Sequence, residues 1–169
     1  MSGCGRFDFE LQRDLDGGAS DGVVLQPDAG YPTMLLCKKT GAPDWIPLTG
    51  PALGYPYGTL TWVPSGPTFR FRVDAWGLAP GDYTIVQYID PYPGMPATDI
   101  ASATVGADGV LTVPETSYEL DRDLTTTNGK VWIVPSALVD TATDMFVAWD
   151  VTAIFFELDF VVYDDTDVP

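Results

Sequence analysis

The chain has 169 residues, a length that suits one domain. Lys and Arg together number 8 against 24 for Asp and Glu, so the net charge is −16. This acidity excludes nucleic acid and anionic membranes as partners, because both bind basic patches. The chain has no histidine, which also excludes Ser-His-Asp and Cys-His catalysis and histidine zinc sites.

Residues typical of turns and strands dominate the chain. It has 17 Gly and 15 Pro, and only four of its 24 acidic residues are Glu. Good helix formers are therefore scarce, whereas the many β-branched and aromatic residues suit strands. Alternating or continuously apolar segments predict nine or ten short strands, chief among them 6–11, 23–25, 34–37, 59–63, 69–75, 83–90, 130–134 and 154–163.

Two of these segments have one apolar face. Apolar residues occupy every second position of 69–75, and Leu60 and Trp62 share a face of 59–63. We expect Trp62 and Trp132 to fill the core, because both lie inside strand patterns. The sequences at 107–109 and 128–129 are typical of tight turns.

A motif at 77–84 predicts how one strand begins. It reads Gly-Leu-Ala-Pro-Gly-Asp-Tyr-Thr and resembles the entry into a strand of immunoglobulin-like and fibronectin-like sandwiches. In related domains the tyrosine, here Tyr83, bonds back to the backbone of the corner. We therefore expect an all-β fold, an antiparallel β-sandwich of immunoglobulin, fibronectin or jelly-roll type.

The sequence predicts a single domain over 1–169. Within it, 1–40 form an N-terminal strand and arm region. Residues 40–58 are rich in Pro and Gly and form an irregular connection.

Several segments together resemble a known family. They read GTLTW, SGPTFRF, GLAPGDYT, YIDPYPG, KVWIVPS and FELDFVVYDDTD, within about 57–167. This pattern is similar to a family of exported β-sandwich proteins from archaea and environmental genomes that has no assigned activity. Members often have Trp-Asn-Pro-Thr where this chain has Trp149-Asp150-Val151-Thr152, so that turn is altered here. The resemblance implies a sandwich fold and an extracellular or cell-surface location.

The two cysteines leave alternatives open. Ser-Gly-Cys at 2–4 resembles the end of a lipoprotein cleavage box, which would make Cys4 the lipidated residue; the other interpretation is an ordinary thiol. Cys4 and Cys37 either form a disulfide or stay apart with Cys37 in the core, and spacing does not decide between these. No apolar run reaches 18 residues, and no hydrophobic signal segment precedes the domain, so we expect no membrane span.

Three acidic clusters predict calcium as the only cofactor. Calcium takes six to eight oxygen ligands, and Asp supplies them in turns. The candidate ligands are Asp14, Asp16, Asp21, Asp121, Asp123, Asp164, Asp165 and Asp167. None of the clusters fits the helix-flanked calcium loop. A solvated acidic surface and the solubility needs of a halophilic source are the competing interpretations.

The sequence does not predict an enzyme. Glu157 and Asp159 have the i, i+2 spacing of carboxylates on one face of a strand, at a separation an acid/base pair could use. Arg70 and Arg72 have the same spacing elsewhere, so we expect a cross-strand charge ladder or solvent exposure instead.

Self-assembly is the function that the sequence favours. The segment 154–163 is apolar on both faces, and Phe155, Val161 and Tyr163 would meet either a second sheet or another subunit. Phe7, Phe9 and Leu11 alternate in a segment that can be donated to a neighbour. We expect a non-enzymatic extracellular protein that assembles with itself in a filament, tubule or layer. The alternative is a carbohydrate-binding or adhesive module that stacks polysaccharide on Trp45 and Tyr92.

Overall fold

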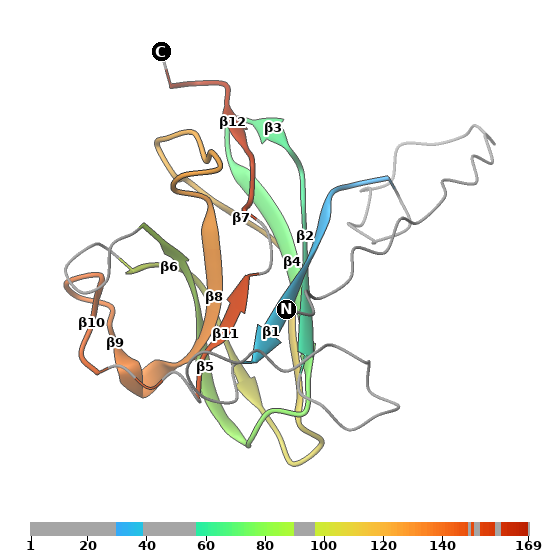
Figure 1. Cartoon of the computed structure of the whole chain (residues 1–169), viewed down its shortest axis with the longest axis vertical. Helices are drawn as coiled ribbons and strands as arrows, with labels where there is room; N and C mark the ends of the chain where they lie inside the picture. Colours follow the sequence, from blue (N-terminus) through green and yellow to red (C-terminus); the bar gives the residue numbers. More distant parts are fainter. Residues whose placement is uncertain are drawn as a thin grey trace, which may run out of the picture.

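A computed structural model describes residues 30–38, 57–89, 97–148, 150, 153–157 and 160–168 of the chain (Figure 1). One short 3-10 helix, η2 (Ser136–Leu138), accompanies the strands there. The strands are β1 (Thr33–Lys38), β2 (Tyr57–Trp62), β3 (Ser65–Gly66), β4 (Phe69–Trp76), β5 (Gly81–Tyr88), β6 (Ala97–Val105), β7 (Val110–Tyr118), β8 (Lys130–Pro135), β9 (Val139–Asp140), β10 (Met145–Phe146), β11 (Phe155–Glu157) and β12 (Asp164–Asp165).

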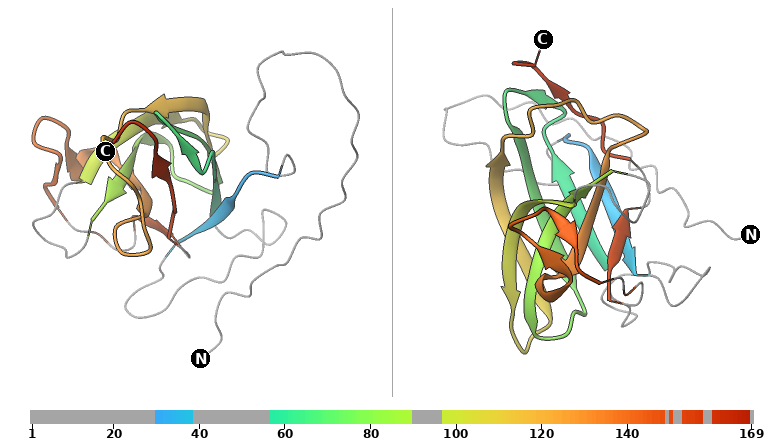
Figure 2. Two further views of the ribbon diagram at one scale, coloured as in Figure 1. Left: turned by 90° about the horizontal axis from the view of Figure 1, so that it is seen from above. Right: turned by 90° about the vertical axis from the view of Figure 1, so that its left-hand side faces the viewer.

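Eight strands form one antiparallel sheet in the order β6-β5-β8-β11-β1-β2-β4-β7. The sheet curls, so its two halves face each other across a core (Figure 2). A single residue pair, Phe155 with Ile133, joins β11 to β8 and thereby links the halves. The all-β antiparallel class is confirmed. The separate layers of a sandwich stay a prediction, because the hydrogen-bonded order runs through all eight strands.

The main core forms where the sequence alternates. Along β4 buried and half-buried residues alternate without a break, and the predicted apolar face of 69–75 is confirmed. Leu60 and Trp62 of β2 are buried against it, with 0% and 7% of their surface exposed. Phe69 and Phe71 stack with ring centroids 5.2 Å apart. Burial of such side chains contributes about 1.5–3 kcal/mol each.

Strands β5 and β8 are buried on both faces. Their inner residues join the main core, whereas Val86, Tyr88, Trp132 and Val134 form a second apolar cluster on the outer face. Tyr88 and Trp132 stack there at 4.1 Å, and Phe146 of β10 packs against both. The core position predicted for Trp132 is therefore confirmed. The segment that includes η2, β9 and β10 covers the outer face of β5 and β8.

The corner before β5 has the predicted geometry. The Tyr83 hydroxyl donates to the Ala79 carbonyl at 3.0 Å. Leu78 is buried, and its N–H donates to the Gly109 carbonyl at 3.1 Å. Gly109 has φ 70°, and a Cβ there would lie 3.0 Å from the Leu78 carbonyl oxygen, so this turn requires glycine. The turn joins β6 to β7, at opposite edges of the sheet.

The ten-residue strand predicted at 154–163 is wrong. Only β11 (Phe155–Glu157) is a strand within that range; 158–159 lie outside the described residues. Further along, the backbone bonds to the loop before β8 instead of to the sheet. Val161 N–H donates to the Gly129 carbonyl at 2.7 Å, and Tyr163 and Leu124 exchange two bonds of 2.9 Å. This loop takes up the hydrogen-bonding groups that a longer strand would have used.

The charge ladder predicted between β4 and the last strand is also wrong. The neighbours of β4 are β2 and β7, whereas β11 lies between β8 and β1. Arg70 therefore pairs with Glu115 of β7, and Arg72 pairs with Asp74 two residues along its own strand at 2.6 Å. Side chains of Glu157 and Asp159 lie outside what the structure describes.

Several predictions fall on parts of the chain that the structure does not describe. They include the N-terminal strand and the connection over 40–58, and with them Cys4, Trp45 and Tyr92. Cys37 lies in β1, but its side chain is not described, so the disulfide stays a prediction. Among the described helical residues, none belongs to a helix with the length and apolar character needed to cross a membrane.

Candidate functional site

The candidate site lies at the end of the molecule where the chain terminates (Figure 1). Three segments meet there: β3, the loop that follows β7, and the C-terminal segment with β12. Strands β12 and β3 pair in parallel, with Asp164 opposite Ser65 and Asp165 opposite Gly66. The Tyr163 hydroxyl donates to the Gly66 carbonyl at 2.5 Å. These bonds hold the C-terminal segment against β3.

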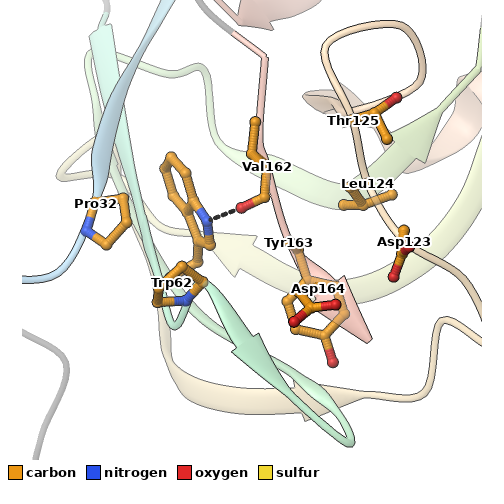
Figure 3. A pocket seen from close by; sticks show the side chains of 9 residues that line it. Pro32, Trp62, Asp123, Leu124, Thr125, Val162, Tyr163 and Asp164 are labelled. Carbon is orange, nitrogen blue, oxygen red and sulfur yellow. Dashed lines mark hydrogen bonds between the residues drawn. The ribbon is translucent and has the colours of Figure 1, made fainter. Parts of the chain in front are cut away.

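A hollow of about 430 Å³ opens beside this junction (Figure 3). The Trp62 indole N–H donates to the Val162 carbonyl at 3.0 Å across it. Its lining is mainly apolar and includes Pro32, Trp62, Pro64, Leu124 and Val162. Asp123 and Asp164 also line it, but each already accepts a hydrogen bond, from the Asp165 N–H and the Ser65 hydroxyl respectively.

An acidic cluster lies at the same end of the molecule. Glu119, Asp165 and Asp167 each place a carboxylate oxygen within 4.8 Å of the other two. Asp165 is buried, with 2% of its surface exposed, whereas Glu119 and Asp167 are exposed. The cluster thus joins the loop after β7 to the C-terminal segment through one buried and two exposed carboxylates.

The buried carboxylate of Asp165 is only partly satisfied. Its Oδ2 accepts the backbone N–H of Arg122 at 3.1 Å. Its Oδ1 is buried and has no hydrogen-bond partner in the part of the chain that the structure describes. Because a buried polar atom without a partner costs free energy, this oxygen requires an explanation.

The carboxylates change the pKa of their neighbours. Contact with the Asp165 carboxyl raises the pKa of Asp167 above its ordinary value, and the charges of Asp165 and Glu119 add to the effect. Burial raises the pKa of the Tyr163 hydroxyl to about 12, and the same acidic residues contribute. The nearby carboxyl groups thus contribute to both shifts.

A buried polar network anchors the loop that supplies Glu119. The Arg122 guanidinium donates to the Gln87 side-chain oxygen at 2.5 Å and to the Thr98 hydroxyl at 3.3 Å. The Gln87 amide in turn donates to the Asn128 carbonyl at 2.7 Å. The Arg122 side chain therefore points to β5 and β6, while its backbone N–H holds Asp165. The arrangement is suited to holding a hard cation among oxygen ligands.

The structure brings together only some of the predicted metal ligands. Asp165 and Asp167 belong to the cluster, whereas Asp164 bonds to Ser65 and Asp123 accepts the Asp165 N–H. Asp121 is exposed with φ 53° and lies outside the cluster. Asp14, Asp16 and Asp21 lie outside the described residues.

Sequence reasoning missed Glu119. The residue begins an alternating series, Glu119-x-Asp121-x-Asp123, and this series was the available signal. The calcium prediction rested on clusters of aspartates, and a glutamate outside such a cluster was not included.

The predicted assembly role of Phe155, Val161 and Tyr163 is wrong. Their exposed fractions are 1%, 0% and 1%, so they fill the core of their own chain. The other prediction for them, packing within the fold, is the one that holds; Tyr163 packs edge-on against Phe69 at 5.2 Å.

The alternate positions Phe160 and Val162 are exposed instead, at 40% and 53%. Phe7, Phe9 and Leu11 lie outside the described residues.

Fold and site together define an all-β protein with a carboxylate cluster at one end of a curled antiparallel sheet. Comparisons with protein-family models, with curated proteins and with solved structures found no match for the chain. The resemblance to exported archaeal proteins therefore stays a prediction.

Proposed function

We propose that the chain is a non-enzymatic structural protein that assembles with copies of itself at a cell surface. The observation that carries this proposal is the contrast between the two edges of the sheet. Among the described strands, β6 pairs only with β5 and β7 only with β4. Edge strands invite pairing with another chain unless proline, lysine or a bulge prevents it.

The two edges differ in this protection. β7 has Pro114 near its middle and Glu115 paired with Arg70, and both features discourage pairing. β6 has nine residues, among them neither proline nor lysine, and its only charged residue is Asp99. Both edge strands contain one bulge, that of β6 at Ile100, so the contrast between them rests on proline and charge. Its half-buried Ala101 and Ala103 pack against the main core. β6 is therefore the edge to which a further strand adds most easily.

The added strand in this proposal is residues 6–11 of a neighbouring copy. Phe7, Phe9 and Leu11 alternate with polar residues, as a strand with one apolar face requires. The absence of histidine from the sequence supports a non-enzymatic role. The resemblance to exported β-sandwich proteins supports a surface location.

Sedimentation velocity of the full chain tests this proposal. The wild type should form large species, and deletion of residues 1–12 should leave a soluble monomer. Ser102→Lys on β6 should weaken assembly, because a lysine on an edge strand opposes pairing. Ser117→Lys is the matched control, since Ser117 is also an exposed serine on an edge strand, β7. A monomeric wild type would overturn self-assembly, and assembly without residues 1–12 would overturn strand donation.

Polysaccharide binding is the second candidate, and the hollow beside Trp62 favours it. Apolar surface beside carboxylates suits sugars, because sugars place their C–H faces on apolar groups and donate hydroxyl hydrogens to carboxylates. Trp62 itself is buried, so the apolar contact would fall on the exposed lining. Val162 lines the hollow and is 53% exposed. Affinity electrophoresis should show retardation by a polysaccharide that Val162→Asp abolishes. No retardation of the wild type by any glycan tested would remove this candidate.

A further inference from the structure

We propose that Glu119, Asp165 and Asp167 form a calcium site that joins the loop after β7 to the C-terminal segment. This inference is independent of self-assembly, because it concerns the closure of one chain. It rests on geometry, on an unpartnered buried oxygen and on the balance of charge around the cluster.

The spacing of the three carboxylates suits one calcium ion. Calcium binds oxygen at about 2.3–2.6 Å, so two of its ligands lie at most roughly 5 Å apart. One oxygen from each of the three residues lies within 4.8 Å of the others. Water molecules can complete the coordination, since Glu119 and Asp167 face solvent.

The second observation is the orphaned oxygen of Asp165. This side chain is 2% exposed, and Arg122 N–H satisfies Oδ2 alone. Oδ1 has no hydrogen-bond partner within the described residues, and the other two members of the cluster are carboxyl groups. A cation held among the three groups would satisfy this oxygen.

No basic side chain neutralises the cluster in the described part of the chain. The two ion pairs there use Arg70 and Arg72. The Arg122 guanidinium, although close in sequence, is turned to Gln87 and Thr98. Three carboxyl groups whose oxygens lie within 4.8 Å of one another repel each other when charged. A divalent cation would relieve this repulsion.

The ligand set favours calcium over transition metals. The three groups offer hard carboxylate oxygens, and the chain contains no histidine. Magnesium requires a near-ideal octahedron at about 2.0–2.1 Å, which a group that includes two exposed side chains does not preorganise. The ion would connect Glu119 to Asp165 and Asp167 and so hold the C-terminal segment against the loop after β7.

Titration of the full-length, chelator-treated protein with calcium tests the site. Isothermal titration calorimetry should give one saturable site with a dissociation constant on the order of 10⁻⁴–10⁻³ M, as in extracellular calcium modules. Terbium is the second probe, because Tyr163 beside the cluster can sensitise its luminescence, and calcium should displace it. Magnesium should compete more weakly.

Substitutions of exposed ligands test the site without disturbing the folded core. Asp167→Asn and Glu119→Gln should each weaken binding about tenfold, because affinity follows the charge of the ligands. Asp82→Asn is the matched control. Asp82 is exposed at the start of β5, and its substitution removes the same charge at a position outside the cluster. Circular dichroism should show that all three variants stay folded.

Two outcomes would overturn the site. Absence of saturable calcium or terbium binding by the folded wild type would mean that Asp165 and Asp167 share a proton instead. Equal weakening by Asp82→Asn and Asp167→Asn would mean that calcium binds diffusely to an acidic surface.

Discussion

Two buried tyrosines hold opposite ends of the sheet by the same kind of bond, but their surroundings differ. At the corner before β5, the Tyr83 hydroxyl donates to a carbonyl four residues away, that of Ala79. At the acidic end, the Tyr163 hydroxyl donates to the Gly66 carbonyl, 97 residues away. The first bond closes a local turn, whereas the second ties the C-terminal segment to β3.

The charges around the two hydroxyls also differ. Burial raises the pKa of Tyr83, and its bond to Ala79 partly opposes the shift. Burial raises the pKa of Tyr163 to about 12, and Asp165, Glu119, Asp167 and Asp164 add to it. The bond at the corner thus joins neutral groups, whereas the bond at the acidic end forms beside carboxylates that repel one another. This difference predicts that conditions affecting charge will alter the acidic end first.

The largest expected effect is at Gly129, where the acidic end depends on a close backbone approach. A Cβ at Gly129 would overlap the Val161 carbonyl oxygen and would also lie 2.8 Å from the Thr125 carbonyl oxygen. Gly129→Ala must therefore displace the C-terminal segment, and we expect the free energy of unfolding to fall by about 3 kcal/mol or more. Urea denaturation measures this change.

Gly106→Ala is the control for Gly129→Ala. A Cβ at Gly106 would meet only the Asp108 side chain, at 3.4 Å, in the turn that belongs to the corner end. Its cost should stay below about 1 kcal/mol. Equal losses in the two variants would show that the approach of Val161 to Gly129 is not a structural constraint.

The next effect compares the two hydroxyls directly. Tyr163→Phe removes the donor to the Gly66 carbonyl, and Tyr83→Phe removes the donor to Ala79. Each change should cost about 1–2 kcal/mol, since a net hydrogen bond contributes about 1 kcal/mol and a buried acceptor is left unsatisfied. Tyr163→Phe should also expose the C-terminal segment to proteolysis, because its bond joins distant segments. Equal protease sensitivity in the two variants would contradict this distinction.

The same contrast explains how much the sequence could predict. The corner at Tyr83 was predicted because all its parts, from Leu78 to the tyrosine, lie within a few residues. The face of β4 was predicted because alternation is a local property. The bond from Tyr163 to Gly66 depends on two segments that meet only in the folded chain, and no local pattern indicates it.

The acidic cluster was predicted in part for the same reason. Asp165 and Asp167 are close in sequence and were found, but Glu119 joins them from a segment more than forty residues earlier. The long apolar segment 154–163 predicted one strand of ten residues. This prediction was wrong because the backbone groups of Val161 and Tyr163 form hydrogen bonds with Gly129 and Leu124 instead of with a neighbouring strand. Periodicity reports which residues alternate, and it does not report which segment their backbone contacts.

A third effect should appear at alkaline pH. The pKa of Tyr163 is about 12 in the folded protein, against an ordinary value of 10.0. The stability that this neutral hydroxyl contributes is therefore fully present below pH 10 and is lost as the pH rises toward 12. Tyr163→Phe should flatten the decline of unfolding free energy between pH 10 and 12. Absorbance at the tyrosinate band during titration measures the pKa, and an ionisation near pH 10 for Tyr163 would contradict the burial argument.

The smallest effect separates charge repulsion from cation binding at the acidic end. The raised pKa of Asp167 means that its stabilising contribution is present below the unfolded pKa and is lost as the pH rises through the folded pKa. In a chelator at neutral pH, Asp167→Asn should therefore raise the melting temperature slightly, because it removes a carboxylate that its neighbours repel. With millimolar calcium the wild type should instead have the higher melting temperature, because it binds the ion more tightly and binding stabilises the folded state. Asp82→Asn lies outside the cluster and should show no such reversal. If calcium left the order of wild type and Asp167→Asn unchanged, repulsion alone would account for the acidic end.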